Sequence, residues 1–184
     1  DGDEQVYVVP TKGGIPKQLT YYPARGPLAP RWGYDHQVYG WTPDGHAVLF
    51  LSWRDRNGGT INTSLYTAPA EGGLPVKLPM PTAGAGDFAP DGKRIVYSPL
   101  FRDFRTWKRY RGGRATSIWV GHPDRGDFAE VSSFDGMNAF PMWHDGRIYF
   151  LSDRGGTGNI WSMRPDGTDR TRHTEFDDWD ARFP

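Results

Sequence analysis

A turn followed by an apolar strand recurs along the sequence and constrains the fold more than any other feature. Proline fixes φ in such a turn, aspartate hydrogen-bonds the nearby backbone and glycine accepts a positive φ, so each copy reverses the chain before a strand. In the third copy histidine replaces proline. The copies are Thr42-Pro43-Asp44-Gly45 before 47–52, Ala89-Pro90-Asp91-Gly92 before 94–98, and Trp143-His144-Asp145-Gly146 before 147–152. This pattern predicts antiparallel strands joined by tight turns.

A second pattern alternates with the first. It consists of a strand, a hairpin turn that contains glycine, and a short strand, and it occurs at 5–20, 64–78, 117–131 and 159–174. Together the two patterns describe a unit of four antiparallel strands. The turns recur at intervals of about 42 to 59 residues, which bracket the spacing of four-stranded propeller blades.

We therefore expect an all-β fold with very little helix, a β-propeller fragment of about three and a half four-stranded antiparallel blades. The many glycines (24), prolines (16) and aromatic residues (15%) fit this turn-rich class. Trp41, Phe88 and Trp143 precede the turns and are expected to pack between blades. The expected parts of the partial propeller 1–184 are the outer strands of one blade at 1–20, complete blades at 37–79, 83–132 and 138–174, and the first strand of a further blade at 179–184.

An incomplete propeller leaves unpaired strand edges, whereas a closed ring hides them. Such edges readily pair with strands of another chain. We therefore predict that the chain forms a homo-oligomer through its open blade edges, or that the remainder of a longer parent protein completes it.

The charges of the sequence balance. Twenty-two Lys plus Arg and 22 Asp plus Glu give zero formal net charge at pH 7, which argues against nucleic acid or a membrane as a partner. There is no cysteine, so the chain has neither a disulfide nor a thiolate nucleophile. The sequence also lacks a signal-peptide pattern and an apolar run of about 20 residues, and we expect a cytoplasmic location.

A basic insertion at 102–114 lies between two predicted strands. One interpretation is a surface loop whose arginines cover the neighbouring blades. The other is a contact for a carboxylate or for another subunit, since guanidinium groups pair bidentately with carboxylates. Trp107 and Tyr110 would suit stacking on single-stranded nucleic acid, but the neutral net charge argues against it. The candidate contact residues are Arg105, Lys108, Arg109, Arg111 and Arg114.

We expect no catalytic residue, no cofactor and no metal site in this chain. The five histidines lack the spacings that bring metal ligands together. Ser52, Ser98 and Ser152 end equivalent strands, which indicates a repeated structural role rather than a nucleophile. The Asp-Gly pairs lack the additional ligands of a calcium loop. These residues are interpreted as parts of the architecture.

The repeat resembles that of the TolB protein, of prolyl-oligopeptidase-type enzymes and of the tricorn core protease. One stretch distinguishes among them. The motif Trp107-Lys108-Arg109-Tyr110-Arg111-Gly112-Gly113, followed by Ser117-Ile118-Trp119, is similar to the insertion in the N-terminal six-bladed propeller of tricorn proteases. The unit at 138–174 resembles the next blade of the same domain.

This resemblance implies the non-catalytic propeller portion of a tricorn-type serine peptidase that degrades oligopeptides, with the propeller as scaffold and peptide passage. The implied partners are copies of the chain, the remainder of the parent protease and oligopeptides. On the inner strands the candidates for peptide contact are Gln37, Asp87, Asn138 and Arg182. Two alternatives stay open: a stand-alone or engineered propeller scaffold that homo-oligomerises, and a TolB-like protein-binding module.

Overall fold

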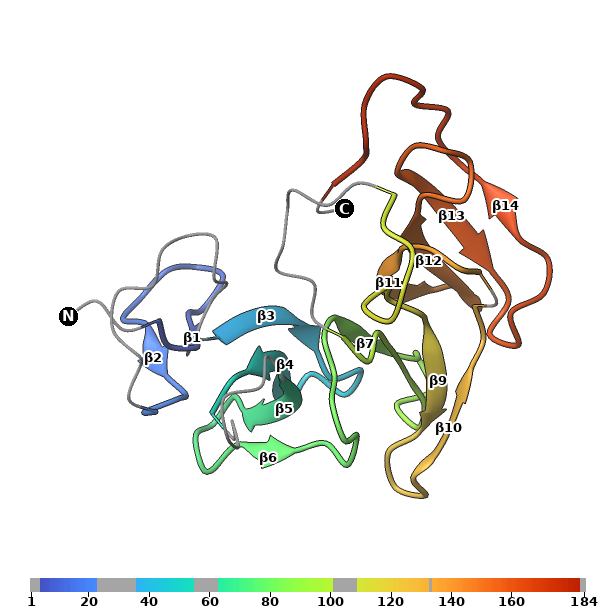
Figure 1. Cartoon of the computed structure of the whole chain (residues 1–184). Helices are drawn as coiled ribbons and strands as arrows, with labels where there is room; N and C mark the ends of the chain where they lie inside the picture. The colour runs from blue at the N-terminus through green and yellow to red at the C-terminus, as the bar shows by residue number, and fades with distance from the viewer. Residues whose placement is uncertain (1–3, 23–35, 55–62, 101–108, 133, 183–184) are drawn as a thin grey trace.

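The computed structural model describes residues 4–22, 36–54, 63–100, 109–132 and 134–182. Within these ranges the chain forms fourteen strands and no helix, so the all-β prediction is confirmed. The strands build four antiparallel sheets that follow one another along an arc, as expected for a propeller fragment (Figure 1). The described residues contain no helix with the length and apolar character needed to cross a membrane.

Three of the sheets have four strands in chain order, and the first sheet has two. The two-stranded sheet consists of β1 (Tyr7–Val8) and β2 (Lys17–Gln18). The next sheet consists of β3 (His36–Trp41), β4 (Ala47–Ser52), β5 (Ser64–Pro69) and β6 (Val76–Lys77); the third of β7 (Gly86–Phe88), β8 (Ile95–Tyr97), β9 (Trp119–His122) and β10 (Asp127–Glu130); the fourth of β11 (Asn138–His144), β12 (Arg147–Ser152), β13 (Asn159–Met163) and β14 (Thr171–Arg172).

The turn between β11 and β12 differs from the Pro-Asp-Gly turns. Asp145 and Gly146 both have positive φ, 43° and 75°. Two consecutive positive φ values define a type I′ turn, which suits the twist of a two-residue hairpin. His144 is consequently the last residue of β11 and pairs with Arg147. Histidine is therefore a strand residue here and does not substitute for the turn proline.

The core consists of three clusters, one between each pair of neighbouring sheets. The sheets therefore pack face to face like propeller blades, with their apolar residues shared between neighbours. The first cluster contains Val6, Leu19, Val48, Phe50, Tyr66 and Ala68; the second includes Leu49, Leu51, Leu65, Leu78, Ile95 and Tyr97; the third includes Val96, Ile118, Trp143, Ile148, Phe150 and Met163.

The three aromatic residues before the turns have different environments. Trp143 is buried in the third cluster and Phe88 is half-buried against the second. Trp41 is 51% exposed, so its predicted packing between blades is wrong. The physical reason is that β1 and β2 cover residues of β4 and β5. The two-stranded sheet has no inner strands to lie against β3 in the described residues.

A hydrogen bond links each complete blade to the start of the segment that follows it. The amide of Ala83 donates to the carbonyl of Thr63 (2.9 Å), that of Asn138 to Thr116 (3.0 Å), and that of Ala181 to Gly158 (2.7 Å). The chain end at Ala181 thus occupies the position of an incoming inner strand. Residues 179–182 form no strand in the structure, because a first strand requires the second strand of its own blade as a partner. A first strand at 179–184 stays a prediction.

Candidate functional site

The inner strands β3, β7 and β11 lie next to one another, since β7 contacts both of the others. They carry three of the four candidates for peptide contact: Gln37 near the start of β3, Asp87 in β7 and Asn138 at the start of β11. The fourth, Arg182, follows the hydrogen-bonded Ala181. The topology therefore brings the three inner strands together, but the four candidate side chains contact different groups.

Asp87 connects two inner strands. Its carboxylate accepts a hydrogen bond from the backbone amide of Trp143 in β11 (2.7 Å). Burial raises the pKa of the Asp87 carboxyl above its ordinary value, and the hydrogen bonds from the Trp143 and Phe88 amides offset this rise only in part. The Asp87 carboxylate thus links two neighbouring blades by a hydrogen bond and also places an acidic group on an inner strand.

Asn138 is fully buried and not accessible to a peptide in this structure. Its Oδ1 accepts hydrogen bonds from the Ser152 hydroxyl and from Nη2 of Arg154, both at 3.0 Å. Gln37 is half-buried, and its Oε1 accepts a 3.4 Å hydrogen bond from the Tyr39 hydroxyl. Burial raises the pKa of that Tyr39 hydroxyl.

Arg182 is partly exposed beside an acidic group. Its Nη2 lies 3.9 Å from Oδ2 of Asp180. Asp180 in turn accepts a hydrogen bond from the amide of Gly158 (2.8 Å), the residue before β13. Arg182 is therefore positioned through the chain end that lies against the last complete blade. The use of these candidates by a peptide stays a prediction.

The basic insertion contacts the blade that follows it. Arg105 and Lys108 lie outside the described residues, whereas Arg109, Arg111 and Arg114 lie within them. Nη1 of Arg111 is 2.9 Å from Oδ2 of Asp153, whose side chain is only 3% exposed. The other oxygen of this carboxylate accepts a hydrogen bond from the Met137 amide (3.0 Å). The ion pair thus joins the insertion to the turn after β12.

A close approach makes this ion pair possible. A Cβ atom on Gly136 would lie 2.7 Å from Nη1 of Arg111, 2.8 Å from Oδ1 of Asp153 and 2.5 Å from a ring carbon of Phe134. Any other residue would therefore displace the ion pair or the ring. Gly112, next to Arg111, has a φ of 136°, a conformation that favours glycine.

The neighbouring arginines of the insertion are exposed. Arg109 has a φ of 52°, and its Nε donates a hydrogen bond to the carbonyl of Gly156 in the same turn as Asp153. Arg114 is exposed as well. Two of the three described candidates thus contact the turn at 153–156. This geometry agrees with the interpretation that the arginines cover a neighbouring blade, and it leaves the contact with another subunit as a prediction.

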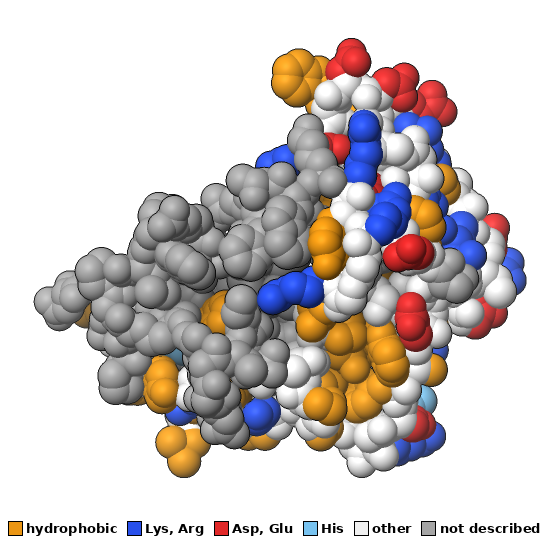
Figure 2. Space-filling model, viewed as in Figure 1, with side chains coloured by type: hydrophobic (Ala, Val, Ile, Leu, Met, Phe, Trp, Pro, Cys, Tyr) orange, Lys and Arg blue, Asp and Glu red, His pale blue; other side chains and the backbone are white. Residues whose placement is uncertain are grey.

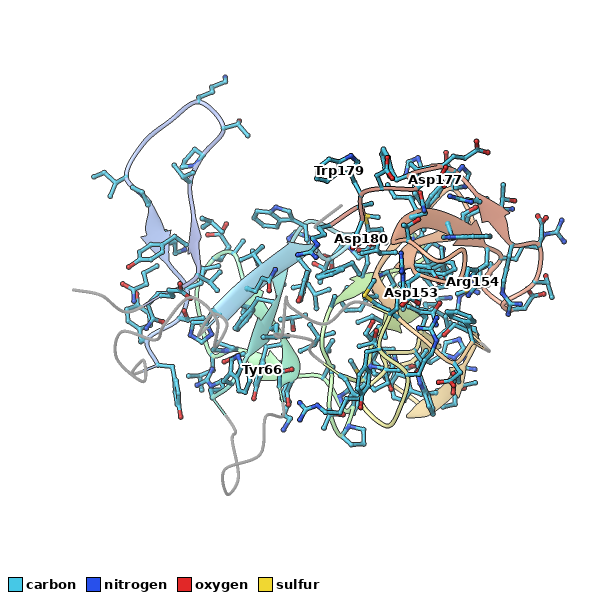
Figure 3. All side chains as sticks on the ribbon, turned by 45° about the horizontal axis from the view of Figure 1, so that its top comes forward. Tyr66, Asp153, Arg154, Asp177, Trp179 and Asp180 are labelled. Carbon is cyan, nitrogen blue, oxygen red and sulfur yellow. The ribbon has the colours of Figure 1, made fainter. Side chains whose placement is uncertain are left out.

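Sequence reasoning missed a pair of arginines that lie over aromatic rings. The guanidinium of Arg154 lies 5.1 to 5.5 Å from the ring centroids of Phe134, Phe150 and Trp161. That of Arg54 lies 5.2 Å from Tyr22 and 5.6 Å from Tyr66. The sequence signal for these two arginines is the repeated spacing Ser-x-Arg at the ends of β4 and β12. It occurs as Ser52-Trp53-Arg54 and Ser152-Asp153-Arg154. A cation over a ring is attracted to it, and the contacts with Tyr22 and Phe134 join each arginine to the preceding blade. Figure 3 shows Asp153 and Arg154 together in the last complete blade.

Metal ligands do not cluster in the part of the chain that the structure describes. Two of the histidines have polar partners of their own. Nδ1 of His122 is 2.8 Å from Oδ1 of Asp127, and Nε2 of His173 is 2.8 Å from the Ser162 hydroxyl. These contacts lie within single sheets and hold turns and strands in place.

With this architecture in view, the comparisons with known proteins decide the family. A family model described as the tricorn protease N-terminal beta propeller domain matches residues 1–184. The chain belongs to this family. A tricorn protease homolog 1 from Streptomyces coelicolor is 38% identical over 186 residues, which cover 99% of the chain and 16% of that relative. The tricorn propeller chain thus spans about one sixth of the length of this relative.

Solved structures support the same assignment. A crystal structure of the tricorn protease superposes on 97% of the tricorn propeller chain with a TM-score of 0.79 and 28% sequence identity, and the match covers 17% of that structure. TolB from Acinetobacter baumannii superposes on 95% of the chain and 38% of its own chain with a TM-score of 0.71 at 18% identity, which is a likeness of fold. The family that the Trp-Lys-x-Tyr-Arg-Gly-Gly motif predicted is therefore confirmed.

Proposed function

We propose that this chain is the non-catalytic propeller portion of a tricorn-type serine peptidase that degrades oligopeptides, and that it serves as a scaffold and a passage for peptides. The observation that supports this most is the match of the whole chain to the N-terminal propeller domain, together with the small share of the relatives that it covers. The catalytic groups then belong to another part of the parent protein.

The passage would run along the inner strands. β3, β7 and β11 meet there, and Asp87 supplies a carboxylate whose pKa burial raises. A carboxylate at this position attracts the amino terminus or basic side chains of a peptide. Arg182, at the chain end, is suited to the opposite end of a peptide, because a guanidinium pairs with a carboxylate.

Assembly would use the open edge of the two-stranded sheet. In the complete blades the third strand pairs with a second strand as well as with a fourth. β1 corresponds to a third strand, and in the described residues it pairs with β2 alone. Its other edge therefore suits a strand from the rest of the parent protease or from another copy of the chain. The absence of cysteine agrees with an assembly in the cytoplasm.

A serine-reactive fluorophosphonate probe tests whether the catalytic serine of the parent protein lies outside residues 1–184. We expect it to label the full-length parent at a serine outside residues 1–184, to abolish the hydrolysis of oligopeptides, and to leave the isolated chain unlabelled. Labelling within residues 1–184 would contradict a non-catalytic role.

The passage is tested in the full-length enzyme with Asp87→Asn. This variant removes the charge and keeps an oxygen that can accept the Trp143 hydrogen bond. We expect a change in kcat/KM that depends on the length and charge of the peptide, with an Asp124→Asn variant in an exposed turn as the control. Equal rates for all peptides in both variants would argue against a passage at the inner strands.

A further inference from the structure

Two blade interfaces contain an arginine over an aromatic ring of the preceding blade. Arg54, after β4, lies over Tyr22, which follows β2. Arg154, after β12, lies over Phe134, which follows β10. In both cases the aromatic residue comes two positions after a hydroxyl residue, Thr20 or Ser132, at the end of an outer strand, and the arginine comes from the next blade.

A hydroxyl residue at this position has the same function in three of the four sheets. The side-chain oxygen of Thr20 accepts a hydrogen bond from the Val6 amide (2.9 Å), that of Ser132 from the Ile118 amide (2.8 Å) and that of Thr174 from the Ile160 amide (3.0 Å). Thr174 is therefore the third member of the series. The residue two positions after it is Phe176.

Phe176 is held by the same set of hydrogen bonds as Tyr22. Thr20 donates to the side-chain oxygen of Gln5 (2.7 Å), and the Gln5 amide group donates to the Tyr22 carbonyl (2.6 Å). Likewise, Thr174 donates to the side-chain oxygen of Asn159 (2.8 Å), and the Asn159 amide group donates to the Phe176 carbonyl (3.0 Å).

Two further hydrogen bonds fix the backbone of Phe176. Its amide donates to Oδ1 of Asn159 (2.9 Å), and its carbonyl also accepts from the Thr157 hydroxyl. The backbone is thus fixed on both sides, while the side chain stays 45% exposed. An aromatic ring is therefore presented at a position where the two equivalent rings receive an arginine.

The charges around Phe176 favour a cation. Glu175, Asp177 and Asp178 are exposed beside it, and Trp179 is 77% exposed. Arg172 carries an opposing charge, and its Nη2 lies 3.9 Å from Oδ1 of Asp177. Figure 2 shows acidic and hydrophobic side chains together at the top of the molecule, where Figure 1 places the segment after β14. In Figure 3 Trp179 points away from the sheet.

The interface between the β3–β6 sheet and the β7–β10 sheet lacks both the aromatic residue and the arginine. After β6 the equivalent of the hydroxyl residue is Pro79, and the position of the aromatic residue is taken by Pro81. After β8 the residue two positions beyond Ser98 is Leu100 in place of arginine. Where the ring is absent, the arginine is absent as well. An aromatic residue at 176 therefore predicts a basic partner.

We infer that Phe176, with the carboxylates of Asp177 and Asp178, is a docking position for a basic side chain. By the two precedents this side chain is an arginine, and it belongs to the turn after the second strand of the blade that follows residue 184. This inference rests on the proposed function, because it requires the parent polypeptide to continue the propeller. It explains why an aromatic ring and three carboxylates are exposed at the chain end.

The test compares Phe176→Ala in the isolated chain and in the full-length parent by thermal unfolding of the propeller. In the parent we expect Tm to fall by about 2–4 °C, and in the isolated chain we expect no change, because no guanidinium of the described residues lies over this ring. Phe134→Ala is the matched control, since its arginine is within the chain, and it should lower Tm in both proteins. Phe176→Tyr keeps the ring and should retain the parent's Tm.

A p-benzoylphenylalanine at position 176 of the parent then identifies the neighbour. A photo-crosslink to the turn after the next second strand is the expected result. An equal effect of Phe176→Ala in both proteins, or a crosslink elsewhere or between copies, would overturn the inference. Failure here is distinct from failure of the proposed function, which is measured by the position of the fluorophosphonate label.

Discussion

The guanidinium of Arg111 and the carboxylate of Asp153, 2.9 Å apart, join the basic insertion to the blade that follows it in the chain. Asp153 is buried, and it also accepts a hydrogen bond from the Met137 amide. The guanidinium lies over the ring of Phe134 at 5.1 Å. Part of the positive charge of the insertion is thus used within the chain, at the interface between two blades.

Removal of this guanidinium leaves the buried Asp153 carboxylate without its ion-pair partner at 2.9 Å. We expect Arg111→Ala to lower the free energy of unfolding by about 1–2 kcal/mol, less than a fully buried pair because Arg111 is partly exposed. Urea denaturation measures this change. Lys12→Ala, in an exposed turn, is the control, and an equal effect of the two substitutions would contradict a role of the ion pair.

Because Gly136 has no side chain, Arg111 and Asp153 have room to form their ion pair. A methyl group there would press on Phe134, Arg111 and Asp153, so we expect Gly136→Ala to cost about 1–3 kcal/mol of stability. Gly113→Ala is a matched control, because a Cβ on Gly113 meets no atom within 4 Å. Thermal unfolding should separate the two variants by several degrees. Similar melting temperatures would show that the close approach is unimportant.

The buried hydroxyl of Ser132 holds the third strand of its blade. Ser132→Ala would leave the Ile118 amide without the 2.8 Å hydrogen bond, and we expect a loss of about 1–3 kcal/mol in the free energy of unfolding. Denaturant unfolding tests this, with Thr11→Ala in an exposed turn for comparison. A stability unchanged within error would mean that the hydroxyl is dispensable.

The raised pKa of Asp87 predicts a dependence of stability on pH. Because the folded state holds this proton more tightly than the unfolded state, the contribution of Asp87 is most favourable at low pH and is lost as pH rises from 3.8 through the raised pKa. Asp87→Asn is neutral throughout and retains an acceptor for the Trp143 amide. Relative to the unmodified chain, it should therefore gain stability as pH rises.

The measurement for Asp87 is the difference in Tm between Asp87→Asn and the unmodified chain from about pH 3 to about pH 7. Taking the difference cancels the contributions of carboxyl groups whose pKa is lowered in the folded state. Asp169 is one of these, because the hydrogen bond and the charge of Arg147 lower its pKa. A difference that does not vary with pH would contradict the assignment. Asp87→Ala removes the acceptor and should be destabilising at every pH.

The fold was predictable because its signals are local and repeated. Each turn sequence determines where a strand begins, and a pattern that recurs can be compared with itself. The turn at Asp145 shows the limit of this reasoning, since two positive φ values made His144 a strand residue. Trp41 shows another limit, because its burial depends on strands of a neighbouring sheet and not on its own sequence.

The candidate site was less predictable because it depends on contacts between distant residues. Arg111 and Asp153 are 42 positions apart, and nothing near either of them in the sequence indicates the pairing. Asn138 was chosen for its place at an inner strand, yet it is fully buried and hydrogen-bonded to Arg154. The Ser-x-Arg spacing was visible, but one aromatic partner of each arginine, Tyr22 or Phe134, lies in the preceding blade.

The central claim is that this chain is an incomplete propeller whose open edges are completed by a neighbour. Multi-angle light scattering of the isolated chain over a concentration series tests it most directly. The account predicts a mass above the 20.8 kDa of one chain, rising with concentration toward a single multiple as β1 and the chain end pair with other copies. A mass of 20.8 kDa at every concentration would contradict pairing of these edges with other copies of the chain.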